Sequence, residues 1–199
     1  LLSPLKKTNG LVFPFTPTII VAHSANYQAI APTHTNYPYF AYQNSQVDQL
    51  VITGDFFVQN GVEAEYWVAA LHYLRSATKM FYGGEAETLG APPPVVKLNG
   101  YGDFIFNNVP VVVTNFTVDL PQDVDYIATG LGKAMSTEKS VSGAAGQTIK
   151  EKRDSVSWAP TQSLITVTVQ PLYSRREIEK FSLQNYVNGE YIKNGGGFI

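Results

Sequence analysis

Apolar residues recur every three or four positions in one long stretch of the chain. Between residues 60 and 81 this repeat places Trp67, Leu74 and Phe81 on one stripe, which predicts an amphipathic helix. Asn60 with Glu63 has the spacing of an N-terminal capping box, and Gly83-Gly84 supplies a C-terminal cap. A second capping box, Ser174 with Glu177, predicts a short helix that runs to about residue 183.

Other stretches alternate with the period of a half-buried strand. Residues 46–57 place Leu50, Ile52 and Phe56 on one face, and residues 163–171 do the same with Ile165, Val167 and Val169. Residues 109–120 also alternate, and two tight turns are expected before them, at Asn99-Gly100 and at Asn107-Asn108. Residues 95–98, 101–106 and 109–120 would then form a three-stranded meander.

Three further regions lack a sustained period. Residues 11–40 are punctuated by prolines and predict an irregular extended arm. Residues 129–157 are rich in Gly, Ser, Thr, Ala and Lys, which is typical of a flexible loop or a long hairpin tip. The tail after Asn188 is rich in glycine and ends in Phe198-Ile199, so we expect it to dock on a partner. The resulting fold class is mainly β with one long flanking helix (α+β), as a sandwich or a barrel.

The composition limits the partners of this chain. At 199 residues it is long enough for one main domain, and because it begins with Leu1 we expect native residues before it. Charged residues are 15% of the chain, aromatic residues are 13%, and the net charge is −2. This balance suits uncharged contacts with proteins and argues against a basic surface for nucleic acid. No segment predicts a signal peptide or membrane insertion, and cysteine is absent.

Searches for catalytic and metal-binding patterns favour structural explanations. The three histidines are scattered, and the aspartates at 119, 123 and 125 lack the remaining ligands of a calcium loop. Gly130-Leu131-Gly132-Lys133 has Ala134 where a phosphate loop needs Ser or Thr. A hydrolase would need a close carboxylate pair, for which the candidates are Asp55, Glu63, Asp103 and Asp125. We expect no enzyme activity, no catalytic residue, no cofactor and no metal.

Aromatic residues supply the candidate interface. Tyr37, Tyr39, Phe40 and Tyr42 form a dense run, and large rings are enriched where proteins meet. The same tyrosines with Trp158 are also compatible with sugar stacking, which leaves a carbohydrate-binding β-sandwich module, of a phage tail or a secreted protein, as the alternative function. The full set of candidate interface residues is Tyr37, Tyr39, Phe40, Tyr42, Lys133, Lys139, Lys150, Arg153, Phe198 and Ile199.

Several whole segments, in order, resemble baseplate tail-tube or tube-initiator proteins of contractile-tailed, T4-like bacteriophages. They are TGDFF at 53–57, LRSATKMFYG at 74–83, APPP at 91–94, NGYG at 99–102, NVPVVVTNF at 108–116, DVDYI at 123–127 and VQPLYSR at 169–175. The resemblance implies an extended arm at residues 1–40, a tail-tube-like β domain at 41–187 with a flexible insertion at about 129–157, and a docking tail at 188–199.

The resemblance also implies a function. It predicts a structural virion protein in the tail or baseplate, made in the bacterial cytoplasm and assembled with copies of itself into a ring, which in this family is a hexamer. Neighbouring tail-tube and baseplate proteins would be its other partners. DNA would pass through the lumen transiently, without sequence-specific binding.

Overall fold

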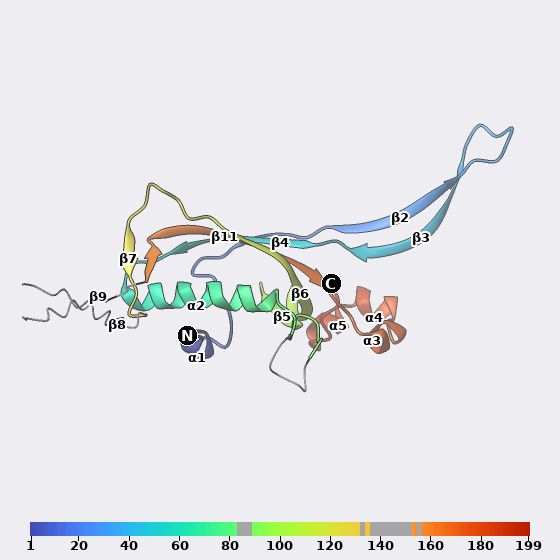
Figure 1. The fold of residues 1–199 in the computed structure, drawn as a ribbon. Coiled ribbons are helices and arrows are strands. Elements are labelled where there is room, and N and C mark those ends of the chain that lie inside the picture. The colour runs from blue at the N-terminus through green and yellow to red at the C-terminus, as the bar shows by residue number, and fades with distance from the viewer. Residues whose placement is uncertain (83–88, 132–133, 136–152, 155–156) are drawn as a thin grey trace, which may run out of the picture. The chain divides into compact units, whose positions relative to one another are not determined.

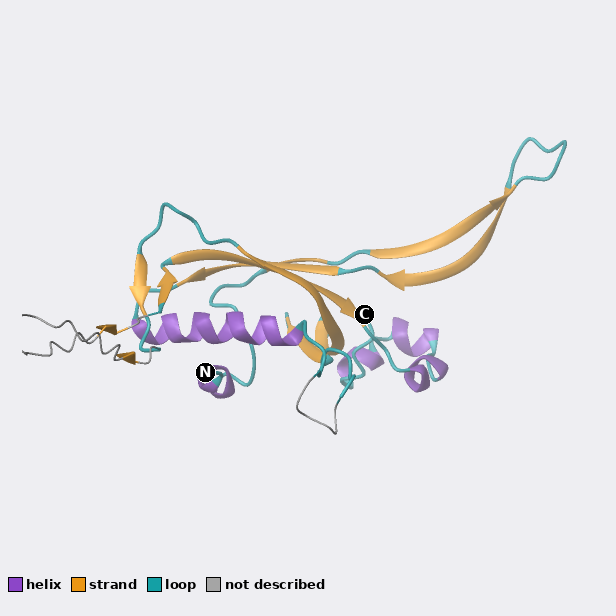
Figure 2. Ribbon diagram, in the orientation of Figure 1, coloured by secondary structure: helices purple, strands orange, loops and turns teal. Residues whose placement is uncertain are grey.

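The structure is a computed structural model that describes residues 1–82, 89–131, 134–135, 153–154 and 157–199 (Figure 1). It is mainly β (Figure 2). The chain divides into two compact units. The first unit contains Leu1–Thr16, Gly54–Arg75 and Val118–Ile165, and the second contains Pro17–Thr53, Ser76–Thr117 and Thr166–Ile199.

The described elements follow one another in this order: α1 Ser3–Lys7, β1 Thr18–Ile20, β2 His23–Ile30, β3 Tyr39–Val47, β4 Leu50–Phe57, α2 Gly61–Ala77, β5 Val96–Gly100, β6 Phe106–Val118, β7 Tyr126–Ala128, β8 Ala134–Met135, β9 Arg153–Asp154, β10 Trp158–Pro160, β11 Gln162–Pro171, α3 Arg175–Glu179, α4 Leu183–Val187 and α5 Glu190–Lys193.

The largest sheet is curled and antiparallel, with the strand order β1-β4-β11-β6-β5. Strand β1 pairs with β4 from Thr18 opposite Thr53 to Ile20 opposite Val51. Between β6 and β11, the Leu172 N–H donates to the Pro110 carbonyl and the Asp119 N–H donates to the Leu164 carbonyl. Because partner numbers fall on one strand as they rise on the other, these two strands also run antiparallel. Strands β1 and β5 are the edges of the sheet.

The strand predictions for β4 and β11 are confirmed on the faces that alternation assigned. Side chains at Leu50, Ile52 and Phe56 are buried, and so are those at Ile165, Val167 and Val169. The predicted strand at 46–57 is nevertheless two strands, because β3 ends at Val47 and β4 begins at Leu50. At the break, Asp48 donates its N–H to the Ala22 carbonyl, and its carboxylate accepts hydrogen bonds from Ser24 and Gln46.

The predicted helix is present as α2 but ends four residues early, at Ala77. Beyond it the Phe81 N–H donates to the Ala91 carbonyl, and the Phe81 carbonyl accepts from the Gly90 N–H, so the backbone at Phe81 leaves the helical bonding pattern. The Gly83-Gly84 cap lies outside the described residues. Elsewhere in the described residues the helices are only four or five residues long. The described helical part is thus α2 together with four short helices, and not a single long flanking helix.

The N-terminus of α2 and its buried stripe explain why this helix forms. The Asn60 side chain accepts the Glu63 N–H at 3.0 Å, as a capping residue does. The Glu63 carboxylate accepts the Gln59 N–H at 2.8 Å, one residue earlier than in a standard capping box. In the core of the first unit, the Trp67 indole N–H donates to Ser163 Oγ of β11 at 2.8 Å, so the polar atom of this large buried side chain is satisfied.

The predicted turn at Asn99-Gly100 is wrong. Strand β5 continues through Gly100, which pairs with Phe106, and the connection is residues 101–105. Three contacts favour this longer loop: Asn99 Oδ1 accepts the Asn108 N–H, the Tyr101 hydroxyl donates to the Pro17 carbonyl, and the Tyr101 ring meets Phe106 edge-on. Asn107 and Asn108 lie inside β6, so the meander predicted from 95 to 120 is a two-stranded hairpin.

The predicted capping box at the start of α3 is confirmed, although α3 ends at Glu179 rather than near residue 183. The Ser174 hydroxyl accepts the Glu177 N–H, and the Glu177 carboxylate accepts the Ser174 N–H at 2.9 Å. Hydrogen bonds from the Ser174 side chain and backbone lower the pKa of Glu177.

We expect Ser174→Ala to destabilise α3 by about 0.5–2 kcal/mol because it removes the cap. The effect should depend on pH. The pKa of Glu177 is lower in the folded chain than its ordinary value of 4.5, so its contribution is complete above that value and is lost as the pH falls through the folded pKa. Hydrogen exchange of the α3 amides between pH 3 and 7 measures this. An equal pH dependence in wild type and Ser174→Ala would contradict it.

Candidate assembly interface

Strands β2 and β3 form a two-stranded hairpin that the sequence did not predict. The register runs from His23 opposite Val47 to Ile30 opposite Tyr39, with an irregularity after Asn26, where Gln43 has no opposite residue. Side chains of both strands are exposed, except Ser24 and Val47, which are partly buried. The region expected to be an irregular arm thus contains a regular ribbon that buries little on either face.

One face of this hairpin is aromatic. Because residues opposite each other share a face, Tyr27 with Tyr42 and Ala29 with Phe40 lie together. The rings of Tyr27 and Tyr42 meet edge-on, with centroids 5.6 Å apart, and the Tyr42 hydroxyl donates to Ser45 Oγ at 2.9 Å. We call this surface the aromatic face; its members are Ala25, Tyr27, Ala29, Phe40, Tyr42 and Ser45, with His23 and Val47 at its base.

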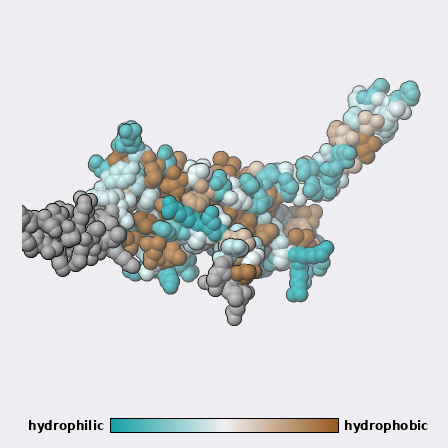
Figure 3. Space-filling view, in the orientation of Figure 1, coloured by the Kyte–Doolittle hydropathy of each residue, from teal (hydrophilic) through white to brown (hydrophobic). Residues whose placement is uncertain are grey.

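The opposite face is rich in side-chain amides that bond to one another. The Asn26 amide donates to Asn44 Oδ1 at 2.8 Å, and the Gln43 amide donates to Gln28 Oε1 at 2.8 Å. Ala41 lies opposite Gln28, and Tyr39 lies opposite Ile30 at the end nearest the loop. We call this surface the amide face. Figure 3 shows hydrophobic and hydrophilic side chains side by side on the hairpin.

The four predicted aromatic residues are all exposed, but the hairpin divides them. Tyr37 lies in the loop at residues 31–38, Tyr39 lies on the amide face, and Phe40 and Tyr42 lie on the aromatic face. Tyr27, which was not among the predicted interface residues, completes the aromatic face. The alternation of Ala25, Tyr27 and Ala29 was the available signal.

The remaining predicted residues lie elsewhere. Lys133, Lys139 and Lys150 are outside the described residues, and Arg153 opens β9, where it pairs with Met135. Phe198 is only 8% exposed, because its ring stacks on Tyr173 of the same unit at 4.4 Å. The Ile199 N–H donates to the Tyr173 hydroxyl at 3.2 Å. Burial raises the pKa of Tyr173. The tail is therefore packed on its own chain in this structure.

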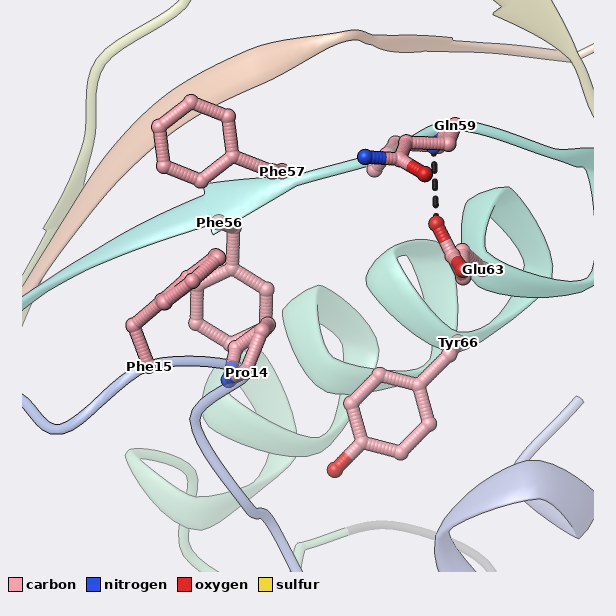
Figure 4. A pocket seen from close by; sticks show the side chains of 8 residues that line it. Pro14, Phe15, Phe56, Phe57, Gln59, Glu63 and Tyr66 are labelled. Atoms are coloured by element: carbon pink, nitrogen blue, oxygen red, sulfur yellow. Dashed lines mark hydrogen bonds between the residues drawn. The ribbon is translucent and has the colours of Figure 1, made fainter.

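A cavity of about 270 Å³ in the first unit is lined mainly by apolar side chains, and its carboxylate and its tyrosine hydroxyl both make hydrogen bonds within the fold (Figure 4). Its one carboxylate, Glu63, accepts hydrogen bonds from the Gln59 N–H and from the Asn60 side-chain amide at the start of α2. Its tyrosine, Tyr66, donates to the Val12 carbonyl and accepts the Val12 N–H. The rest of the lining is Pro14, Phe15, Phe56, Phe57, Val58 and Gln59.

The acidic residues considered for hydrolysis are all exposed: Asp55, Glu63, Asp103 and Asp125. Within the described residues, no group of three or more His, Cys, Asp and Glu side chains is placed to hold a metal ion. Over the same part of the chain, none of the helices has the length and apolar character needed to cross a membrane. The β2–β3 hairpin, with its exposed aromatic side chains, is therefore the candidate functional surface.

The chain was compared with known proteins on the basis of its sequence. A scan against protein families found none that matches it, and a search of curated proteins found no significant relative.

Proposed function

We propose that this chain is a structural virion protein that forms a ring of a phage tail tube or of its baseplate-proximal end. The observation that carries the proposal is the exposed β2–β3 hairpin. An isolated two-stranded ribbon is at best marginally stable in water. Contact with neighbouring subunits would bury the exposed ribbon and supply the stability that it lacks alone.

The edges of the large sheet support the same proposal. Within the part of the chain that the structure describes, strands β1 and β5 end the sheet, and no further strand pairs with their outer sides. Natural proteins cover or interrupt such edges, and closed rings cover them with neighbouring subunits. We further propose that the curled antiparallel sheet belongs to a sandwich or barrel of the tail-tube type. The order of the sequence segments that resemble that family also supports this fold.

The charge of the chain fits a channel through which DNA passes. With 14 basic and 16 acidic residues, the chain lacks the excess of cations that retains phosphates. Passage needs weak and sequence-independent contact, so a wall with few cations is suited to it. We accordingly propose transient passage of DNA through the lumen of the ring and no specific recognition.

The alternative is a carbohydrate-binding module, favoured by the exposed rings of the aromatic face. Sugars stack on flat aromatic platforms, whereas Tyr27 and Tyr42 are inclined at 67° to each other. Trp158, the other ring considered for sugar stacking, lies in β10 of the first unit rather than in the hairpin. We therefore rank this function second.

Assembly is the property that tests the proposal. Purified full-length protein, alone and with candidate tail components, is measured by mass photometry and negative-stain microscopy. We expect rings or short tubes with a central channel. A chain that stays a monomer under all of these conditions would contradict the proposal, and binding to a glycan array by that monomer would support the alternative.

A further inference from the structure

We infer that the aromatic face of the β2–β3 hairpin packs against a second copy of this chain, while the amide face stays in contact with water. This inference rests on the proposed function, because it requires self-association. It goes further by naming which of two exposed faces the neighbouring copy buries.

The aromatic face has the most to gain from burial. Tyr27, Phe40 and Tyr42 are each more than half exposed. Apolar ring surface leaves water favourably. The cross-strand contact between Tyr27 and Tyr42 also holds both rings in place before a partner arrives, which lowers the entropy lost on binding.

The amide face has less to gain. Its Asn26–Asn44 and Gln28–Gln43 pairs each use one donor and one acceptor internally. A side-chain amide has two donors and two acceptor lone pairs, so the remaining groups need water or a partner that matches them. Burial without such a match carries a desolvation penalty. Ile30 and Tyr39 also lie on this face, but only at its loop end, and both are exposed. Along the part of the ribbon that carries the amide pairs, the two faces therefore differ in what burial would cost.

A second copy is the occupant that the charges favour. From Thr8 to Val47 the chain contains no Lys, Arg, Asp or Glu. When the same segment of two copies comes into contact, any charge on it faces an identical charge, and the repulsion opposes association. Here that repulsion is absent. A partner chosen by charge complementarity would find no Lys, Arg, Asp or Glu side chain to pair with on this hairpin, whose strands carry one titratable group besides the tyrosines, His23 at the base.

Single cysteines report the two faces separately, because the native chain has none. Ala29→Cys places a thiol on the aromatic face opposite Phe40, and Ala41→Cys places one on the amide face opposite Gln28. Both alanines are exposed and both lie within the paired strands, so the two variants are matched. Maleimide labelling is timed on the assembled and unassembled fractions of each variant, separated by size under reducing conditions.

We expect assembly to slow the labelling of Ala29→Cys by roughly tenfold or more, because a buried thiol reacts only when its surroundings open. Ala41→Cys should label at a similar rate in both fractions. A second pair of variants checks the energetics: Tyr27→Ser with Tyr42→Ser should abolish assembly, and Gln28→Ser with Gln43→Ser should preserve it.

The outcomes separate this inference from the function on which it rests. If the protein assembles but Ala29→Cys stays reactive, or if Ala41→Cys is the protected site, the inference is wrong and the assembly proposal stands. Protection of Ala29→Cys only after another tail component is added would replace the second copy by that component. A wild-type chain that never assembles overturns both.

Discussion

Replacing Phe56 by Ala is expected to destabilise the first unit by about 3–5 kcal/mol, the usual range for a buried phenylalanine. Phe56 lies on the buried face of β4 and is 1% exposed. Its ring contacts Phe13, with centroids 5.3 Å apart. Truncation removes this contact and leaves a cavity that the surrounding strands and helix cannot fill without moving.

The neighbouring phenylalanine is a matched control. Phe57 points to the other face of β4, is 38% exposed and contacts Phe15 edge-on, also at 5.3 Å. Phe57→Ala deletes the same atoms from the same strand, yet should cost only about 1–2 kcal/mol, because the edge-on pair contributes about 0.5–1.5 kcal/mol and the ring is only partly buried. The ratio of the two decreases in unfolding free energy tests which face of β4 is buried, because both variants remove the same side chain.

Tryptophan fluorescence during urea unfolding is a suitable measurement for both variants. The chain has two tryptophans, Trp67 and Trp158, and both belong to the first unit. The signal therefore reports the unit that contains the mutation. Similar midpoints for Phe56→Ala and Phe57→Ala at unchanged slope would show that β4 does not bury the face described here.

The strands and helices that the sequence predicted correctly are those whose period is local and complete. Strand β11 alternates apolar and small polar residues from Ile165 to Val169, and the apolar parity is buried. Helix α2 carries its stripe over four turns and begins at a recognisable cap. In both cases each residue's surroundings follow from its own few neighbours in sequence.

The missed features depend on contacts between residues far apart in sequence. Asn99-Gly100 has a strong preference for a hairpin turn, but the hydrogen bond from Tyr101 to the Pro17 carbonyl joins residues 84 positions apart and favours the longer loop. Helix α2 likewise ends at Ala77, before the predicted residue 81, because the Phe81 backbone forms hydrogen bonds with Gly90 and Ala91. Local propensity predicted an outcome that tertiary contacts changed.

The candidate interface also depends on contacts between residues far apart in sequence. An aromatic run at residues 37–42 is visible in the sequence, but its division between two faces is not. Face assignment needs the pairing of Tyr42 with Tyr27, which lies before the loop. The alternation of Ala25, Tyr27 and Ala29 marks one face of β2, but a ribbon exposed on both sides has no buried face to fix its register, so the sequence does not show which β3 residues share the face of Tyr27.

Phe198→Ala distinguishes a tail that packs on its own chain from a tail that docks on a partner. The Phe198 ring contacts Tyr173, Phe181 and Tyr191, with centroids 4.4, 5.5 and 5.2 Å away. Loss of a ring so enclosed should destabilise the C-terminal segment by about 3 kcal/mol, the lower end of the usual range, because α3, α4 and α5 bury no side chain of their own and can detach without unfolding the rest.

Hydrogen exchange in the unassembled chain measures this loss directly. The Gly196 N–H donates to the Tyr191 carbonyl and the Ile199 N–H to the Tyr173 hydroxyl, and both amides should exchange on the order of a hundredfold faster in the variant, since 1.4 kcal/mol corresponds to tenfold. Val187→Ala, at a side chain that is 75% exposed in α4, is the control and should leave them unchanged.

The two roles predict opposite patterns for the same variant. If Phe198 is a core residue, exchange in the isolated chain rises, and any loss of assembly is secondary to a detached tail. If Phe198 serves a partner, exchange in the isolated chain stays at the wild-type rate while assembly fails. The aromatic contacts within the unit favour the first pattern, and with it an interface that lies on the hairpin rather than on the tail.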